Sequence, residues 1–228
     1  MKRILVSLAA LTLLTAAALP ASADVLYSQA TDFTAGRWQS ETSNGSNGAN
    51  QAFDNFTLST TGTINNVSWT GLLNPDFTPV DGFTIGFYED NFDTIDSPGS
   101  VGTLLASTVI SGDAGQTANS TPNVGAFGVF NFDTAITAFT ATADTTYWIS
   151  IVGNPDINSG DVYWSFSDQG DGSFITSNNN GVGVIGADLA FTLSDTTVPE
   201  PSGLVLDGTG LMVLAGFGRR LLARSARA

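Results

Sequence analysis

The chain has 228 residues, no cysteine and no histidine, and its 21 acidic and seven basic residues give a net charge of −14. The missing residue types exclude thiol nucleophiles, His-based catalytic triads, imidazole metal ligands and disulfides. An acidic chain also repels nucleic acid and anionic lipid, so nucleic-acid binding is excluded.

The first 23 residues have the three parts of a secretory signal peptide. Two basic residues precede an apolar run of residues 4–19, and the sequence Pro-Ala-Ser-Ala follows. The small residues Ala21 and Ala23 form the Ala-x-Ala pattern that signal peptidase cleaves. We therefore expect a signal helix over residues 1–23 and an exported chain whose mature form begins at Asp24. The alternative is an uncleaved N-terminal anchor.

Residues 24–197 are more acidic than the chain as a whole. They hold 19 acidic residues and one basic residue, Arg37, which gives a charge of −18, and they contain no lysine. Schiff-base chemistry is therefore excluded as well, and only carboxylates, hydroxyls and a bound hard cation remain for catalysis. The segment is long enough for one domain with a sizeable core.

Residues 24–194 are predicted to form an all-β domain. Helical periodicity is missing, and short alternating runs of β-branched and aromatic residues are bounded by Gly, Asn, Asp or Pro. The composition of two segments, 40–50 and 173–186, predicts loops. Ten short strands predict an antiparallel, jelly-roll-like β-sandwich; they are 25–28, 51–58, 63–72, 82–88, 103–109, 125–132, 136–142, 146–152, 162–167 and 188–194.

Alternation along these runs also assigns side chains to faces. The predicted inward set is Val67, Trp69, Phe83, Ile85, Phe87, Tyr147, Ile149, Ile151, Val162, Trp164 and Phe166. Three aromatic residues, Tyr88, Trp148 and Tyr163, are predicted to point outward. They are candidates for stacking on sugar rings, and the alternative is that they cover the second face of the sandwich under a loop.

The order of the strands resembles a β-sandwich module found repeatedly in secreted bacterial proteins. The resemblance covers residues 52–194 and rests on Phe-Thr-Ile-Gly-Phe-Tyr at 83–88, Thr-Leu-Leu-Ala at 103–106, Thr-Thr-Tyr-Trp-Ile-Ser-Ile at 145–151 and Asp-Leu-Ala-Phe at 188–191. These are packing motifs, so the resemblance implies a fold and no particular activity.

Two acidic clusters have the oxygen ligands that Ca²⁺ prefers. The first offers Glu89, Asp90, Asp93 and Asp96, and the second is Asp-Gln-Gly-Asp-Gly at residues 168–172. Neither matches the EF-hand loop. The alternative is that these acids are solvated and bond to their own turns. A glycosidase would need two carboxylates, Glu89 and a nearby Asp, but most of the acids lie in turns and we predict no catalytic residue.

The C-terminal tail is predicted to be a linker followed by a membrane helix. Residues 195–202 form the linker, in which the prolines prevent regular helix or strand. Residues 203–228 hold an apolar run and an arginine-rich end, and with the residues just past that run the helix reaches membrane length. Cationic residues stay in the cytoplasm, which places the preceding domain outside.

This tail resembles the PEP-CTERM sorting signal of bacterial envelope proteins, which often accompanies the module described above. The Pro-Glu-Pro motif is Pro199, Glu200 and Pro201, and Arg219 and Arg220 follow the apolar run as a membrane stop. The resemblance implies that an exosortase cuts near the motif during export. A plain C-terminal anchor without processing is the alternative.

These patterns lead to three hypotheses. The first is a non-catalytic surface or extracellular-matrix protein, without a cofactor other than Ca²⁺, that meets signal peptidase, exosortase and the membrane on its way to the cell surface. The second is a carbohydrate-binding module of the envelope or exopolysaccharide. The third is a carboxylate-dependent glycoside hydrolase.

Overall fold

The computed structural model describes residues 24–34, 36–42, 49–73, 80–90, 102–121, 123–155, 162–178 and 181–195. Within these residues no helix is long and apolar enough to cross a membrane. The signal helix predicted for residues 1–23 and the helix predicted for residues 203–228 lie outside them. The described part is all β, and every pair of strands is antiparallel.

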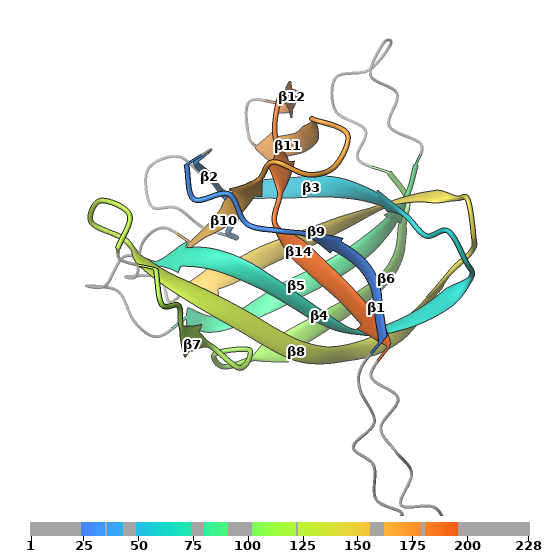
Figure 1. Cartoon of the computed structure of the whole chain (residues 1–228), viewed down its shortest axis with the longest axis horizontal. Coiled ribbons are helices and arrows are strands. Elements are labelled where there is room, and N and C mark those ends of the chain that lie inside the picture. Colours follow the sequence, from blue (N-terminus) through green and yellow to red (C-terminus); the bar gives the residue numbers. More distant parts are fainter. Residues whose placement is uncertain are drawn as a thin grey trace, which may run out of the picture. The chain divides into compact units, whose positions relative to one another are not determined.

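The strands form two sheets (Figure 1). The eight-stranded sheet has the order β1-β14-β4-β10-β13, with β8 and then β7 on the other side of β4 and with β2 beside β10. The six-stranded sheet has the order β12-β11-β3-β9-β5-β6. The strands are β1 Asp24–Gln29, β2 Arg37–Gln39, β3 Asn50–Thr57, β4 Gly62–Leu73, β5 Val80–Glu89, β6 Leu104–Ser111, β7 Thr117–Ala118, β8 Gly128–Ala141, β9 Thr146–Pro155, β10 Val162–Ser167, β11 Phe174–Asn178, β12 Gly181–Ile185, β13 Asp188–Leu189 and β14 Phe191–Asp195.

The core lies between the two sheets, on the faces that alternation predicts. Phe83, Ile85 and Phe87 of β5 are buried, as are Val67 and Trp69 of β4. Stacked aromatic pairs join the layers or neighbouring strands, with ring centroids 4.9 Å apart for Trp69 and Phe132 and 4.5 Å apart for Phe87 and Phe139. Each such side chain contributes about 1.5–3 kcal/mol through burial, so this aromatic layer is a main source of stability.

Strand β8 corrects one sequence prediction. The runs 125–132 and 136–142 are parts of one long strand, Gly128–Ala141, which pairs with β4 from Gly62↔Ala141 to Leu73↔Gly128. The sequence predicts a break between them because Asp133 is of a residue type that is common in turns. That prediction was wrong. In the structure Asp133 is exposed on the strand, opposite Ser68, and accepts a hydrogen bond from the Asn66 amide.

The segment 173–186, predicted as a loop, contains the hairpin of β11 and β12. The hairpin pairs from Phe174↔Ile185 to Asn178↔Gly181, and β11 also pairs with β3. The Gly, Asn and Ser content of the segment suggested a loop, but Phe174 and Ile175 are buried and hold the hairpin on the sheet. The strand β2 was not predicted either.

The first and last strands lie side by side. In the ladder of β1 with β14, Asp24 is paired with Asp195. Residues Ala23–Thr196 form one compact unit, which contains every described strand. The first and last described residues, Asp24 and Asp195, therefore lie side by side at the same end of this ladder (Figure 1).

Candidate functional site

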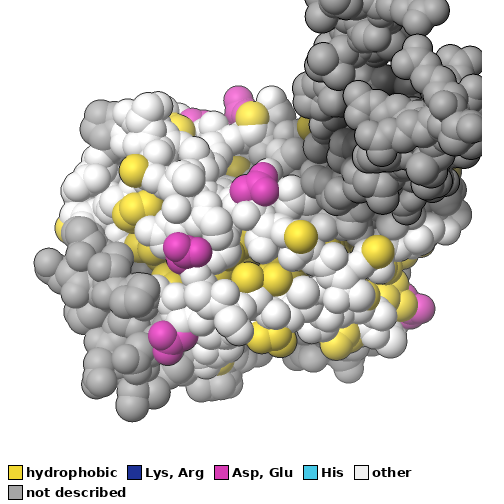
Figure 2. All heavy atoms as spheres, turned by 90° about the horizontal axis from the view of Figure 1, so that it is seen from below, with side chains coloured by type: hydrophobic (Ala, Val, Ile, Leu, Met, Phe, Trp, Pro, Cys, Tyr) yellow, Lys and Arg dark blue, Asp and Glu magenta, His cyan; other side chains and the backbone are white. Residues whose placement is uncertain are grey.

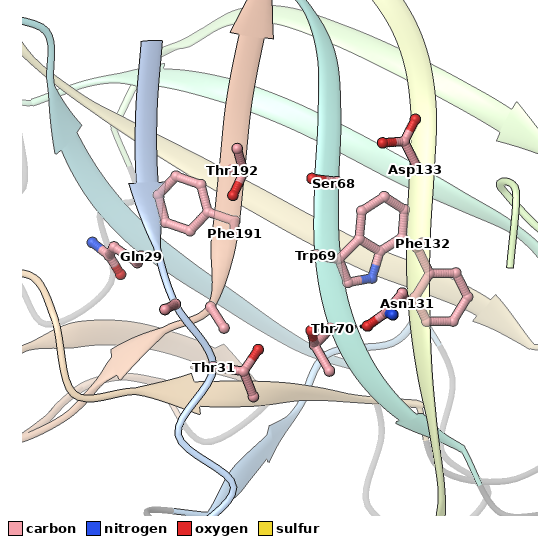
Figure 3. A pocket seen from close by; sticks show the side chains of 12 residues that line it. Gln29, Thr31, Ser68, Trp69, Thr70, Asn131, Phe132, Asp133, Phe191 and Thr192 are labelled. Carbon is pink, nitrogen blue, oxygen red and sulfur yellow. Dashed lines mark hydrogen bonds between the residues drawn. The ribbon is translucent and has the colours of Figure 1, made fainter. Parts of the chain in front are cut away.

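A groove of about 310 Å³ opens on the outer face of the eight-stranded sheet (Figure 3). Trp69, Phe132 and Phe191 line its floor, and their side chains are almost completely buried. The polar side chains around it come from the end of β1, from β4, β8 and β14; they are Thr31, Ser68, Thr70, Asn131, Asp133 and Thr192. The walls thus offer hydroxyl and amide groups with a single carboxylate.

The groove exists because two strands share one edge of β4. β14 pairs with β4 over Asn66–Trp69, and β10 pairs with it over Gly71–Leu73, so neither strand pairs with Thr70. Between β13 and β14, the Ala190 amide donates to the Ser165 carbonyl of β10. The sequence predicted one strand over 188–194, and its division into two strands that pair with different partners leaves the hollow.

Hydrogen bonds hold the walls of the groove in place. The hydroxyls of Ser28 and Thr192 are 2.8 Å apart, and the amide oxygen of Asn131 accepts from the Asn119 amide at 2.7 Å. The Asn66 amide donates to Asp133, while the other atom of that amide, Oδ1, is buried without a hydrogen-bond partner. Neutral donors and acceptors that are already ordered suit a ligand rich in hydroxyls.

Arg37 lies on the same outer face, because its cross-strand partner Ser165 alternates with the core residue Trp164. The Arg37 guanidinium carbon is 4.1 Å from the ring centroid of Phe127 and 4.9 Å from that of Tyr163. The two rings are in edge-to-face contact with centroids 5.0 Å apart. Tyr163, one of the predicted sugar-stacking residues, therefore forms part of a cation–π cluster.

The other two predicted sugar-stacking residues, Tyr88 and Trp148, lie on the outer face of the six-stranded sheet. There they pack against Phe53, Ile175 and Val182 as a second, smaller hydrophobic cluster. Trp148 is only 7% exposed, and its indole N–H donates to Asp90 Oδ1 at 2.8 Å. The structure thus brings Tyr88 and Trp148 together and places Tyr163 on the other sheet; stacking on sugars stays a prediction.

Of the four predicted Ca²⁺ ligands, the structure describes Glu89 and Asp90, and Asp93 and Asp96 lie outside the described residues. Glu89 and Asp90 are exposed at the end of β5. In the described part of the chain no three acidic side chains are grouped closely enough to hold a metal ion. Calcium binding at this cluster stays a prediction.

The acidic turn at residues 168–172 is organised around carboxylates that accept hydrogen bonds. Asp188 accepts from the backbone amides of Gly172 and Ser173, and Asp171 accepts from the amide and hydroxyl of Ser173 and from the Asn55 side chain. Carboxylates that accept hydrogen bonds from the backbone of a turn stabilise that turn, so these bonds indicate a structural role for Asp171 and Asp188. Burial nevertheless raises the pKa of Asp188.

A buried carboxyl group that sequence reasoning missed lies where the two sheets meet. Asp54 of β3 is 0% exposed, and it accepts from the backbone amides of Asn55 at 2.8 Å and Leu189 at 2.6 Å. The Gln29 amide fits best when its nitrogen donates to Asp54 at 3.0 Å and its oxygen accepts from the Tyr27 hydroxyl at 2.7 Å. Burial dominates these contacts and raises the pKa of Asp54 to about 8.

No family model matches the chain, and no relative is found among curated proteins. The groove, the aromatic clusters and the ends of the domain are the features that bear on function.

Proposed function

We propose that the chain is a non-catalytic surface or extracellular-matrix protein of the cell envelope. On this proposal, signal peptidase removes residues 1–23, the C-terminal helix holds the precursor in the membrane, and an exosortase cuts near Pro199, Glu200 and Pro201. The product is the acidic β-sandwich at the cell surface, which works by binding and not by turnover.

The observation that supports this proposal best is the pairing of β1 with β14. The expected mature N-terminus, Asp24, is the first residue of β1, and it pairs with Asp195, the last residue of β14. Every described strand lies between these two residues. Cleavage at both expected sites would therefore leave all the ladders intact, as a protein delivered by two removable signals requires.

We further propose that the two-sheet fold is a jelly roll of a secreted protein, and the path of the chain and its surface support this. The chain crosses repeatedly between the sheets: β3 and β5 belong to the six-stranded sheet, and β4 between them belongs to the other. Figure 2 shows a face on which separate acidic side chains lie among polar groups and scattered hydrophobic side chains, without a basic side chain in view. Such a surface stays soluble outside the cell.

The test is mass spectrometry of the protein taken from the cell surface. We expect a mature chain that begins at Asp24 and ends near Pro199. The substitution Glu200→Ala is expected to leave a full-length precursor in the membrane, and replacing Arg219 and Arg220 by Ala is expected to impair the membrane stop and misroute the chain. A surface protein that still ends in Ala228 would contradict processing and leave a plain anchor.

The groove favours carbohydrate binding as a second candidate function. Its walls carry ordered hydroxyl and amide groups, which are the partners that sugar hydroxyls use. A glycan array on residues 24–197 tests it, and Ser68→Ala on the groove wall should weaken any binding found. Turnover of oligosaccharides that is lost in Glu89→Gln would instead indicate the glycosidase.

A further inference from the structure

Arg37 is the only basic residue between residues 24 and 197, a segment that contains 19 acidic residues. Its guanidinium lies over the rings of Phe127 and Tyr163. Among the residues that the structure describes it forms no ion pair, and its buried Nε has no hydrogen-bond partner. An arginine that serves only stability in so acidic a domain would be expected to pair with one of these acids, because a bidentate carboxylate uses its N–H donors.

A second buried polar atom without a partner lies directly across from Arg37. Ser165 of β10 is paired with Arg37 of β2, and its hydroxyl oxygen is buried and has no hydrogen-bond partner. Directly opposite residues of an antiparallel pair point to the same side of the sheet. A buried unpartnered polar atom costs about 1–3 kcal/mol, so two of them at one position indicate a place adapted to something other than stability.

This position adjoins the groove. Gly71 of β4 pairs with Trp164 of β10, and the residues next to them are Thr70 on the groove wall and Ser165 opposite Arg37. Because neighbouring strands are about 4.8 Å apart, Arg37 lies two strand spacings, roughly 10 Å, from Thr70. One ligand of two or three sugar units can therefore reach both.

We propose that this outer face binds a sugar chain that carries an isolated carboxylate, a uronic acid within an otherwise neutral oligosaccharide. The Arg37 guanidinium, held flat by Phe127 and Tyr163, receives the carboxylate, and the groove receives the hydroxyls of the neighbouring sugars. The inference rests on the second candidate function above, carbohydrate binding, and names its ligand.

The charge of the domain selects this ligand over other anions. A net charge of −18 repels polyuronates, anionic membranes and further copies of the domain. At physiological ionic strength, charges more than about 8 Å apart are largely screened from each other. A single ligand carboxylate bound at Arg37 is therefore attracted by the guanidinium and is repelled little by the distant acidic residues. A sparsely charged glycan therefore gains the contact with Arg37 without the repulsion that a polyanion meets.

The experiment compares a tetrasaccharide that contains one glucuronic acid with the same tetrasaccharide after reduction of its carboxyl group. Binding to residues 24–197, which contain all the described strands, is measured by NMR titration. We expect the wild type to bind the acidic form about tenfold more tightly, as one charge-assisted contact provides. Arg37→Gln should bind both forms equally, and Thr70→Ala should weaken both to the same extent.

The matched control is Ser107→Ala, an exposed residue of β6 in the other sheet, which should change neither affinity. A preference that survives in Arg37→Gln would overturn the proposal, and so would equal binding or no binding by the wild type. If Arg37→Gln fails to fold, the Nε–H resonance of Arg37 in the wild type decides: it should move with the acidic form alone. None of these results bears on export and processing. The proposal of a uronic-acid ligand and the proposal of a processed surface protein can therefore be contradicted independently.

Discussion

The two outer faces of the sandwich differ in what they expose. The face of the eight-stranded sheet is hollowed by a polar groove over β4, β8 and β14. The face of the six-stranded sheet carries the cluster of Phe53, Trp148 and Ile175, and at its margins the cross-strand register places the exposed side chains of Val109 and Val184 on the same face.

The difference shows that an outward-pointing aromatic residue is not by itself a binding residue. Tyr88 and Trp148 point away from the core as alternation predicts, but Trp148 is as buried as a core residue, and the Tyr88 hydroxyl accepts from the Gln51 amide at 3.0 Å. On the opposite sheet, polar side chains form the walls of the groove, and the aromatic residues of its floor are buried. We therefore propose that the face of the six-stranded sheet serves stability and that the groove of the eight-stranded sheet serves recognition.

The largest effect that tests this assignment is expected for Trp148→Ala. The substitution removes a buried indole and its hydrogen bond to Asp90, which should destabilise the domain by about 3–5 kcal/mol. On the other face, Thr70→Ala should change the free energy of unfolding by at most about 0.5 kcal/mol. Urea unfolding of both variants measures the difference.

A reversed result would break the comparison. If Trp148→Ala costs less than about 1 kcal/mol and abolishes glycan binding, while Thr70→Ala leaves glycan binding intact, the aromatic face is the recognition surface. The predicted stacking role of Tyr88 and Trp148 would then replace the groove.

The next effect concerns Asp54, which joins the two sheets through its bonds to β3 and β13. Its pKa is raised from 3.8 to about 8, so the folded state holds a proton that the unfolded state has lost. This contribution to stability is complete below pH 3.8 and is lost as the pH rises through about 8. The negative charges of Asp188 and Asp171 also raise the pKa of Asp54. On the other side, the Tyr27 hydroxyl bonds to Gln29, whose amide lies beside Asp54.

We therefore expect the wild type to lose stability between pH 5 and pH 8, by a few kcal/mol. The variant Asp54→Asn cannot ionise, so its stability should change much less over this range, although its absolute stability is lower because an amide cannot accept both backbone N–H bonds. Urea midpoints at pH 5, 6.5 and 8 test this. Parallel pH profiles of the two proteins would show that Asp54 titrates normally.

Much of the fold could be predicted because alternation reports directly on burial. Phe83, Ile85 and Phe87 alternate with small or polar residues, and the structure buries all three between the sheets. Composition was the weaker guide. It suggested a turn at Asp133 and a loop at 173–186, where pairing with β4 and β3 keeps the backbone extended.

The candidate site could not be predicted from local sequence. The groove depends on β14 and β10 meeting the same edge of β4, and this is a consequence of topology. Asp54 lies in the predicted strand 51–58, on the face it shares with Ala52 and Phe56, but only its position against Leu189, 135 residues away along the chain, reveals the contact that its carboxyl group makes. The sequence shows Arg37 as the lone basic residue of the domain, but the rings beside it, those of Tyr163 and Phe127, come from β10 and from a distant turn.

A smaller loss of stability than that of Trp148→Ala is expected at Gly86, whose substitution would disturb the ring of Tyr88. A Cβ atom at this position would lie 2.8 Å from Cε2 of Tyr88 and 2.9 Å from its hydroxyl oxygen, so Gly86→Ala must displace the ring and its bond to Gln51. We expect a loss of about 1–2 kcal/mol. Gly183→Ala is the matched control on the same sheet, because its Cβ would meet only Thr176 at 3.6 Å, and it should be neutral in urea unfolding. Equal stability of the two variants would mean that Tyr88 is free to move on this face, as a residue that binds a ligand can be.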